Sequence, residues 1–412
     1  MNLAGWNVLG MRVMWRNRDF LKLWVGQAVS ASGSAITTVA MPLVAVVSLG
    51  ASPVEMGLLS ALTVVPHLVF GLPAGVWVNR LSRRRVMIVA DLGRALLLGA
   101  IPVLSAVGLL RMEHLYVVAV LAGVLTLLSD TASMTLLPAL VPRDDLMQAN
   151  SASMLTQTVA STTGPSVAGV LAQVASAPFA IAVDAMSFVV SAVASFLIKE
   201  PARPVVVGRR YHLLEGLREL FGNPVLSALT LSAAIAAIAG AAQAPLVVLY
   251  LVRDLHWPPL LVGVTITVGG VSSVVATMVA PSYSRKLGVG RAYLSGQFLA
   301  SLAGAALAAG WMPLVLLSQL LTGAGMPLYG VPQRTLRQAL VPAHLLAQVT
   351  ASWRTLVIGG QTVGAVMGGL AAAHFGVRPT LVLSSLGMLA GVAVAAWSPL
   401  RGLVGLPAKL TS

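Results

Sequence analysis

The chain contains no cysteine, and only 9% of its 412 residues are charged. The missing cysteines exclude disulfide bonds and thiolate metal sites. Soluble globular proteins carry about 25% charged residues, so this chain cannot cover a water-facing surface. That excludes soluble enzymes, disordered tails and coiled coils. A G-x-x-x-x-G-K-S/T loop is also missing, which excludes ATP-driven transport, and no His, Asp or Glu cluster has metal or nucleophile spacing, which argues against an enzyme.

Long hydrophobic runs dominate what is present, and 57% of the residues are hydrophobic. A membrane-spanning helix needs about 20 apolar residues, roughly twice the length of a strand in an outer-membrane barrel. The sequence therefore predicts an all-α polytopic membrane protein with twelve transmembrane helices, arranged as two six-helix pseudo-repeat bundles. The predicted spans are 20–49, 54–78, 86–109, 115–140, 150–174, 177–198, 224–251, 258–283, 291–309, 312–340, 350–374 and 376–398.

The basic residues predict the orientation of these spans. Of the 26 Lys and Arg residues, 21 fall in segments that are cytoplasmic if the N-terminus is, and only Arg111, Arg253 and Arg378 fall in outer loops. This bias predicts a multi-pass protein of the plasma (cytoplasmic) membrane with both termini inside, and an uncleaved first span. The net charge of +14 sits in these loops, so no nucleic-acid partner is expected.

Residues 199–223 form the longest polar stretch and predict the domain boundary. We expect an N-terminal bundle over 1–198, a cytoplasmic linker over 199–223, and a C-terminal bundle with a short tail over 224–412. Apolar and charged residues alternate within the linker at helical spacing, which predicts an amphipathic helix on the inner membrane surface. A structured linker fits the same pattern.

The two halves share a sequence repeat. Ala139-Leu140-Val141-Pro142 recurs as Ala339-Leu340-Val341-Pro342, and three further identities continue at the same offset of 200: Gln148 with Gln348, Gly164 with Gly364 and Gly169 with Gly369. Many secondary transporters are built from such repeats, with the transport pathway at the interface between them. A repeat without a transport role is the alternative.

The loop after the second span has a recognisable spacing, from Gly75 through Asn79-Arg80 to Arg83-Arg84. It resembles the G-x-x-x-D-R-x-G-R-R loop of the major facilitator superfamily, which helps hold the two halves of such transporters closed on the inside. Here Asn79 and Ser82 replace the family's Asp and Gly, so Asn79 cannot supply the charge. A basic loop that only sets the orientation is the alternative.

The fifth span carries Gly164, Pro165 and Gly169, which resemble the G-P-x-x-G-G element of superfamily members that export by exchange with protons; Ala168 replaces one glycine. Pro165 would bend the span, and the small residues would give a flat face for another helix. A bent packing helix without a transport role would look similar.

The whole chain resembles the macrolide-efflux and enterobactin-exporter branch of that superfamily. The resemblance rests on five segments, Phe20 to Gln27, Asp91 to Arg94, Leu136 to Pro142, Ala149 to Ser151 and Asp184 to Phe188. In this branch the first span often has Gly-Asp where this chain has Gly33-Ser34. If that Asp couples protons in relatives, this chain must couple differently.

Polar side chains recur inside several spans and predict a substrate cavity. The candidates are Gln27, Ser30, Ser34, Gln157, Gln243 and Gln361. By the superfamily resemblance, spans 1, 2, 4 and 5 and their repeat mates 7, 8, 10 and 11 would line it. Hydrogen bonds between helices would explain each stripe equally well.

Ionisable residues inside spans are costly and point to function. Asp130, Asp184 and His67 are the proton-coupling candidates, and Asp91, Arg94 and Arg354 form a predicted charge network. We expect Arg94 to contact Asp130, directly or through water, because the two lie at matching depth on successive spans. Asp130 is then the leading proton-linked acid and Asp184 the second; a static pair is the alternative.

Together these features predict a secondary active exporter of a bulky, largely apolar small molecule, such as a drug, macrolide-like compound, siderophore or secondary metabolite, working by proton antiport with alternating access. An importer of a nutrient or siderophore is the main alternative, and a non-transporting sensor or scaffold is a third. We expect a monomer in the lipid bilayer whose partners are the substrate and protons, with the proton gradient as energy source and no cofactor or metal.

Overall fold

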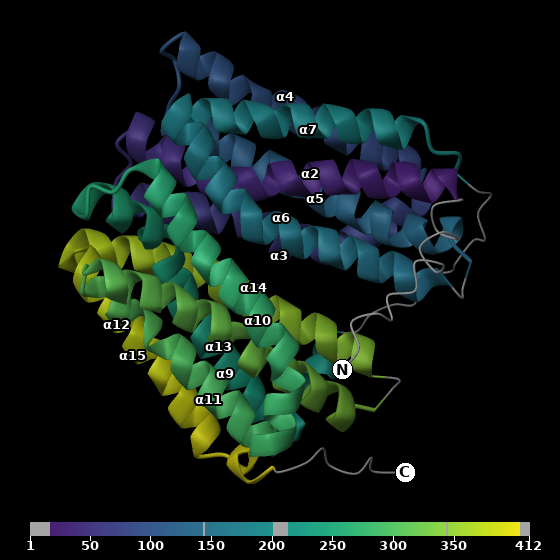
Figure 1. Ribbon diagram of the computed structural model, residues 1–412. Helices are drawn as coiled ribbons and strands as arrows, with labels where there is room; N and C mark the ends of the chain where they lie inside the picture. The colour runs from purple at the N-terminus through teal and green to yellow at the C-terminus, as the bar shows by residue number, and fades with distance from the viewer. Residues whose placement is uncertain (1–16, 143–144, 201–212, 343–344, 404–412) are drawn as a thin grey trace, which may run out of the picture. The chain divides into compact units, whose positions relative to one another are not determined.

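The computed structural model describes residues 17–142, 145–200, 213–342 and 345–403, and within these ranges it leaves out the side chains at 72, 75–76, 79–80, 147, 213–215 and 347 (Figure 1). Every regular element in the described ranges is helical. This agrees with the composition, because a helix satisfies its own backbone hydrogen bonds inside a bilayer. In chain order, the helical elements of the first half are α2 (Arg18–Leu43), η2 (Val44–Ser48), α3 (Pro53–Arg80), α4 (Arg83–Ala106), α5 (Met112–Leu140), α6 (Leu146–Val174) and α7 (Ala177–Phe196).

The second half begins with a short helix and then repeats the pattern of long ones. Its elements are α8 (Leu213–Gly222), α9 (Pro224–Leu249), η4 (Tyr250–Asp254), α10 (Pro259–Leu287), α11 (Val289–Ser301), α12 (Ala303–Ala308), α13 (Met312–Leu340), α14 (Leu346–Phe375), α15 (Val377–Ala396) and η5 (Pro399–Gly402). Three pairs of helices, α5 with α13, α6 with α14, and α7 with α15, begin at positions 200 residues apart. The sequence offset of 200 is thus also an offset of helix boundaries.

Ten helices of the described residues are long and apolar enough to cross a membrane. The predicted spans 150–174 and 291–309 fall outside this set for different reasons. Helix α6 is 29 residues long but carries a run of Ser, Thr, Asn and Gln residues over its first half. The span predicted at 291–309 is interrupted at Leu302, which gives the 13-residue α11 and the 6-residue α12.

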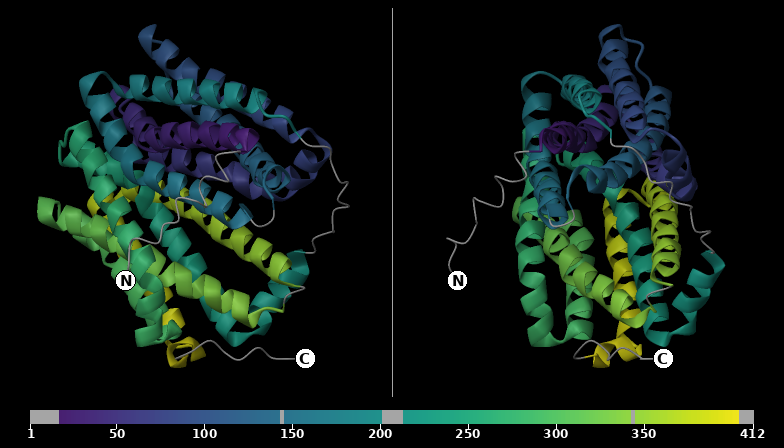
Figure 2. Two further views of the ribbon diagram at one scale, coloured as in Figure 1. Left: turned by 45° about the vertical axis from the view of Figure 1, so that its right-hand side comes forward. Right: turned by 90° about the vertical axis from the view of Figure 1, so that its right-hand side faces the viewer.

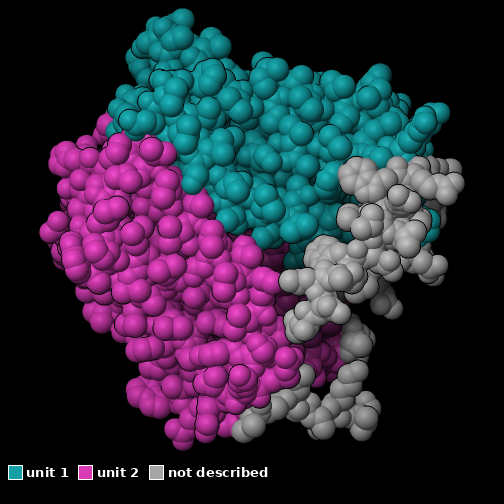
Figure 3. Space-filling view, viewed as in Figure 1, with its two compact units in different colours: residues 1–49, 69–208 teal, residues 50–68, 209–412 magenta. Residues whose placement is uncertain are grey.

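Contacts divide the chain into two compact units (Figure 3). Unit 1 comprises residues 1–49 and 69–208, and unit 2 comprises residues 50–68 and 209–412. The division predicted from the sequence put all of residues 50–68 in the N-terminal bundle. They group with unit 2 because Gly57 of α3 packs closely on α14, where an added Cβ would lie 2.6 Å from the carbonyl oxygen of Ala365. Arg253 also donates to the carbonyl oxygens of Gly50 and Ala51, at 3.3 and 3.4 Å.

Within unit 1, α2 packs along α7 and α6, and α4 packs along α5 and α7 (Figures 1 and 2). Small residues allow the close approach of α2 and α7: an added Cβ at Gly26 would lie 3.0 Å from the Cβ of Ala194. Phe20, Leu136 and Ile198 belong to an apolar cluster that packs at the end of the unit where α2 begins. This packing brings residues from four helices together in the interior.

Within unit 2, α8 lies against α14. Gly216 allows the contact, because an added Cβ there would lie 2.5 Å from the carbonyl oxygen of Gln348. Leu220 is fully buried in a cluster with Leu226 and Val349, whereas Arg218 and Phe221 are exposed. The predicted amphipathic helix is therefore a structured, packed element from Leu213 onward; Arg210 and Tyr211, which the prediction included, lie outside the described residues.

Candidate coupling site

A buried polar cluster lies in unit 1 where α2, α4, α5 and α7 meet. Helix α7 supplies Asp184, Ser187 and Ser191, whose spacing of three or four residues puts them on one face. That face turns inward, since these three side chains are 1%, 7% and 2% exposed. Helix α4 supplies Asp91 and Arg94, which share a face for the same reason.

Asp91 and Arg94 form a buried ion pair on α4. Asp91 is fully buried and Arg94 is 5% exposed, and an amino group of Arg94 donates to Asp91 Oδ1. Arg94 also donates to Thr126 Oγ1 of α5 at 3.3 Å, and its guanidinium lies 4.0 Å from the ring centre of Phe188. Ser129 donates to Asp91 from α5, and Ser191 lies beside it on α7. The pair is balanced in charge and ties α4 to both neighbours.

Asp184 has a different environment, made of hydroxyl groups. Thr37 of α2 donates to Asp184 Oδ2 at 2.5 Å, and Ser187 donates to Oδ1 at 3.0 Å. No Lys or Arg of the described residues forms an ion pair with Asp184; the cation that acts on it is Arg94, which is already paired with Asp91. Gly33 makes room for this carboxylate, because an added Cβ would overlap Asp184 Oδ1 and Ser187 Oγ.

Unit 2 has a buried polar cluster without a charge. Ser232 of α9 lies 2.8 Å from Gln297 Oε1 of α11 and 2.7 Å from the carbonyl oxygen of Gly391 on α15, and Tyr293 donates to Ser232 at 3.0 Å. Among the described residues of unit 2, no Asp or Glu is buried. The two buried acids of the described chain, Asp91 and Asp184, are thus both in unit 1.

The expected direct ion pair between Arg94 and Asp130 needs correction. The carboxylate that pairs with Arg94 is Asp91, one turn away on its own helix. On α5, the residues that reach the pair are Thr126 and Ser129, whereas Asp130 is exposed. Matching depth was a sound argument, but Asp130 lies one residue further round α5 than the face that meets α4. His67 is half-buried on α3, and like Asp130 it makes interactions of its own.

The family is decided by comparison with known proteins. The sequence profile described as Major Facilitator Superfamily matches residues 23–351 and 229–404, most of the chain. The chain belongs to the major facilitator superfamily. It is 26% identical over 398 residues to the enterobactin exporter EntS of Citrobacter koseri, covering 90% of this chain and 89% of that protein. It is 28% identical over 182 residues to macrolide efflux protein A of Streptococcus pyogenes, covering 44% of this chain and 45% of that one.

Solved structures support the same fold. A crystal structure of the nucleoside transporter NupG superposes with a TM-score of 0.79, covering 92% of this chain and 98% of that chain, at 11% sequence identity. At that identity the likeness concerns the fold alone. The predicted resemblance to the macrolide-efflux and enterobactin-exporter branch is confirmed by the sequence relatives, and the chain is a membrane transporter of this superfamily.

The superfamily loop between α3 and α4 is held by an acid that the sequence motif does not include. The structure describes only the helical backbone of α3 at Gly75, Asn79 and Arg80, and not the side chains of the last two. At the start of α4, Glu200 accepts from the backbone N–H groups of Arg83 and Arg84, at 3.1 and 3.4 Å, and from the hydroxyl of Ser82. Arg84 donates to the carbonyl oxygen of Phe196 and lies over its ring. Glu200 thus places a negative charge at the N-terminus of α4, where the helix dipole favours it.

The motif of the fifth span lies on α6, and its small residues meet another helix, as expected. Gly164 faces α2, where an added Cβ would lie 2.9 Å from the carbonyl carbon of Ala35. Pro165 and Gly169 are buried, and Ala168 is fully buried. The contact joins α6 to α2 at Ala35, which is two residues from both Gly33 and Thr37 and so lies on a different side of α2 from the one that meets Asp184.

The predicted cavity residues divide into two groups. Gln243 faces other helices of unit 2, since Ser384 of α15 donates to its Oε1 at 3.4 Å. Ser30 bonds within its own helix, to the carbonyl oxygen of Gln27. The remaining candidates have side chains that are at least partly exposed, and their role in a cavity stays a prediction: Gln27, Ser34, Gln157 and Gln361. Arg354, predicted for the charge network with Asp91 and Arg94, is exposed on α14, and neither ion pair of the described residues includes it.

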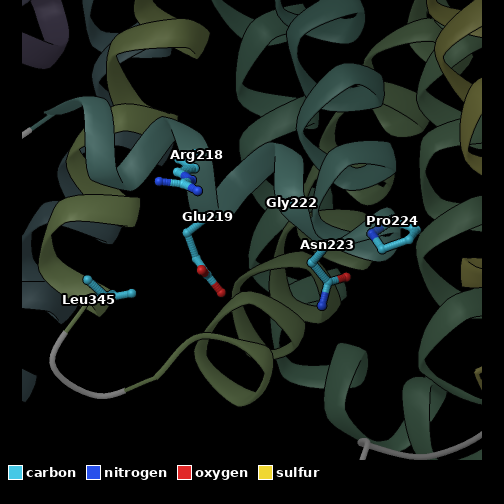
Figure 4. A pocket seen from close by; sticks show the side chains of 6 residues that line it. All are labelled: Arg218, Glu219, Gly222, Asn223, Pro224 and Leu345. Carbon is cyan, nitrogen blue, oxygen red and sulfur yellow. The ribbon is translucent and has the colours of Figure 1, made fainter.

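A cavity of about 540 Å³ opens elsewhere in unit 2, at the junction of α8 and α9 (Figure 4). Arg218 and Glu219 of α8 line it, together with Asn223, the residue that caps α9, and Leu345 from the turn before α14. None of the predicted cavity residues lines it. It is therefore a feature of the linker junction rather than of the residues that the sequence proposed for the substrate.

Sequence reasoning missed several residues of the buried polar cluster and of the loop before α4. Thr37 was not among the predicted residues, and Gly33 was named only in a comparison with the superfamily branch, because partners 147 residues away in the chain leave no local signal. Glu200 was counted as part of the linker. Its position two residues after Ile198, the last residue of the span predicted at 177–198, was the available sign that it lies close to the bundle.

Proposed function

We propose that this transporter exports a bulky, largely apolar small molecule in exchange for protons, and that Asp184 carries the proton. The observation behind this proposal is the buried carboxylate of Asp184, whose direct partners are the hydroxyl groups of Thr37 and Ser187. A hydroxyl can donate to a carboxylate and accept from a carboxylic acid, so this environment can hold Asp184 with or without its proton. The carboxylate of Asp91, by contrast, has its own cation in Arg94.

The chemistry required of the chain is modest. In antiport, one acid takes a proton from one side of the membrane and releases it on the other, and substrate binding alternates with protonation. Thr37 and Ser187 orient the carboxylate, and Gly33 lets it lie directly against α2. Because Asp184 links α2 to α7, a change in its protonation changes the contact between these two helices. The Asp91–Arg94 pair holds α4 in place beside them.

Direction and substrate class are supported by the sequence relatives and by composition. Two relatives are named as an enterobactin exporter and a macrolide efflux protein. The polar side chains proposed for the cavity are amides and hydroxyls, which suit an adaptable, mostly apolar site. The protein works as a monomer in the plasma membrane, with both termini cytoplasmic, two six-helix bundles joined through 199–223, and no cofactor or metal.

A survival assay tests this function. Cells with and without the gene are exposed to a panel of toxic compounds that includes macrolides, with and without a proton uncoupler. Export predicts that the gene raises survival for a subset of apolar compounds, and that the uncoupler removes the advantage. Greater sensitivity in cells that carry the gene would instead indicate import, and an advantage that persists with the uncoupler would exclude proton coupling.

A further inference from the structure

A second group of buried polar side chains lies in unit 2, near the end of α13. Gln333 and Arg337 are one helical turn apart on α13, so they share a face, and they are 5% and 7% exposed. The guanidinium of Arg337 lies 4.0 Å from the ring centre of Trp353 on α14. The three side chains come from the two helices that flank the Ala339-to-Pro342 repeat. At the corresponding positions of the first half, 200 residues earlier, stand Leu137 for Arg337 and Ser153 for Trp353.

These side chains carry hydrogen-bond donors that find no acceptor among the described residues. The donors are Nε2 of Gln333, Nε and Nη1 of Arg337, and Nε1 of Trp353. Leaving a buried donor without an acceptor costs about 1–3 kcal/mol, and more when the group is charged. Several such donors on adjacent side chains are therefore rare in native proteins and indicate a binding site. All three residues present donors, which suits an acceptor with several oxygen atoms.

The charge of Arg337 also has no counter-charge among the described side chains. An arginine stays protonated in proteins, and no Asp or Glu of the described residues forms an ion pair with Arg337. The charged side chain that acts on it is another cation, the exposed Arg334. This differs from unit 1, where the buried Arg94 has Asp91. A buried cation requires a negative partner, and the part of the chain that the structure describes does not supply one.

We propose that Gln333, Arg337 and Trp353 form a binding site for an anionic oxygen group, a phosphate or a carboxylate. The guanidinium fork binds two oxygens of such a group at once, and the amide and indole N–H groups bind the others. Trp353 covers one face of the guanidinium, so the ligand approaches along its edge. The group can belong to a lipid headgroup or to a free molecule. The site does not depend on the export proposed above.

Ligand-dependent stability of the purified full-length protein tests this site. The free-anion arm titrates inorganic phosphate in neutral detergent, and the lipid arm compares vesicles of phosphatidylglycerol with vesicles of phosphatidylcholine. Thermal unfolding is followed for the wild type, Arg337→Gln and Arg334→Gln. Arg334→Gln is the matched control, since it removes the same charge from an exposed position one turn earlier on α13.

The site predicts that phosphate, phosphatidylglycerol or both stabilise the wild type and Arg334→Gln but not Arg337→Gln. Stabilisation by phosphate indicates a free anion, and stabilisation by phosphatidylglycerol alone indicates a lipid headgroup. Two milder variants serve if Arg337→Gln fails to fold. Arg337→Lys keeps the charge without the fork, and Trp353→Phe keeps the ring without the N–H; each should weaken the apparent affinity about tenfold or more. Affinities equal to the wild type in these variants, or no stabilisation of the wild type by either probe, would overturn the proposal.

Discussion

Thr37 and Asp184 lie 147 residues apart in the chain, and the Thr37 hydroxyl donates to the Asp184 carboxylate at 2.5 Å. The contact places an acid from α7 beside Gly33-Ser34 of α2. In the branch of the superfamily that the chain resembles, α2 itself often carries Gly-Asp at this point. The chain therefore has a carboxylate at the same level of α2, but a different helix supplies it.

The first prediction concerns Gly33. Replacing it with Ala adds a Cβ that overlaps Asp184 Oδ1 and Ser187 Oγ, so α2 and α7 must move apart. We expect a loss of stability of about 1–3 kcal/mol, typical of overpacking, measured as a lower unfolding temperature in detergent. Gly99→Ala in α4 is the control, because its Cβ would meet only the Cβ of Ala185 at 3.8 Å. Equal unfolding temperatures for the two variants would contradict the close contact.

The second prediction compares two ion pairs of unit 1. Asp91→Asn leaves Arg94 buried without its carboxylate, which costs about 3–5 kcal/mol in comparable buried pairs. Asp19→Asn breaks the ion pair between Asp19 and Lys22, whose side chains are 27% and 32% exposed, respectively. Ion pairs this exposed contribute about 0–1 kcal/mol to stability. Thermal unfolding in detergent should separate the two variants clearly. If Asp91→Asn is as stable as Asp19→Asn, the buried pair does not hold α4 in place.

The third prediction concerns Glu200 at the start of α4. Glu200→Ala removes the acceptor of the Arg83 and Arg84 amides, so hydrogen exchange at these two amides should become faster. The loss of such a cap amounts to about 1 kcal/mol. Glu55→Ala is the control, since Glu55 accepts from Ser52 at the start of α3 and should leave the α4 amides unchanged. Unchanged exchange at residues 83 and 84 in Glu200→Ala would show that another group caps α4.

The helices and the family were predictable from the sequence, and the partners within the site were not. Span lengths follow from hydrophobic runs, so the predicted 177–198 and 312–340 agree with α7 and α13 to within two residues. The pairing of Arg94 depended on a rotation of one residue about α5, from Ser129 to Asp130. Depth along a helix fixes position to one turn, whereas the partner depends on which side of the helix faces inward, and hydropathy does not resolve neighbouring residues on an apolar helix.

The residues with the largest consequences were also the least visible in the sequence. Arg337 looked like one more basic residue at the inner end of a span, and only its burial against Trp353 sets it apart. Asp184 was noticed because acids inside spans are rare. Its hydroxyl partner and the glycine that makes room for it became apparent only when α2 was placed against α7.

The fourth prediction tests the orientation. Since the chain has no cysteine, single cysteines introduced at Arg85 and Leu109 report without background. Both positions are exposed, Leu109 at 60%. A membrane-impermeant thiol reagent added to intact cells should label position 109 and leave position 85 unlabelled until the cells are opened. Labelling of position 85 from outside would reverse the predicted topology.

The role of Asp184 is tested most directly by proton movement in reconstituted vesicles. The wild type, Asp184→Asn and Thr37→Val are reconstituted with a pH-sensitive dye inside, and a compound identified in the survival assay is added on one side. The wild type should move protons against the compound, and Thr37→Val should do so with an altered pH dependence. Asp184→Asn should exchange labelled for unlabelled compound without moving protons. If Asp184→Asn moves protons at the wild-type rate, Asp184 does not couple transport to the proton gradient.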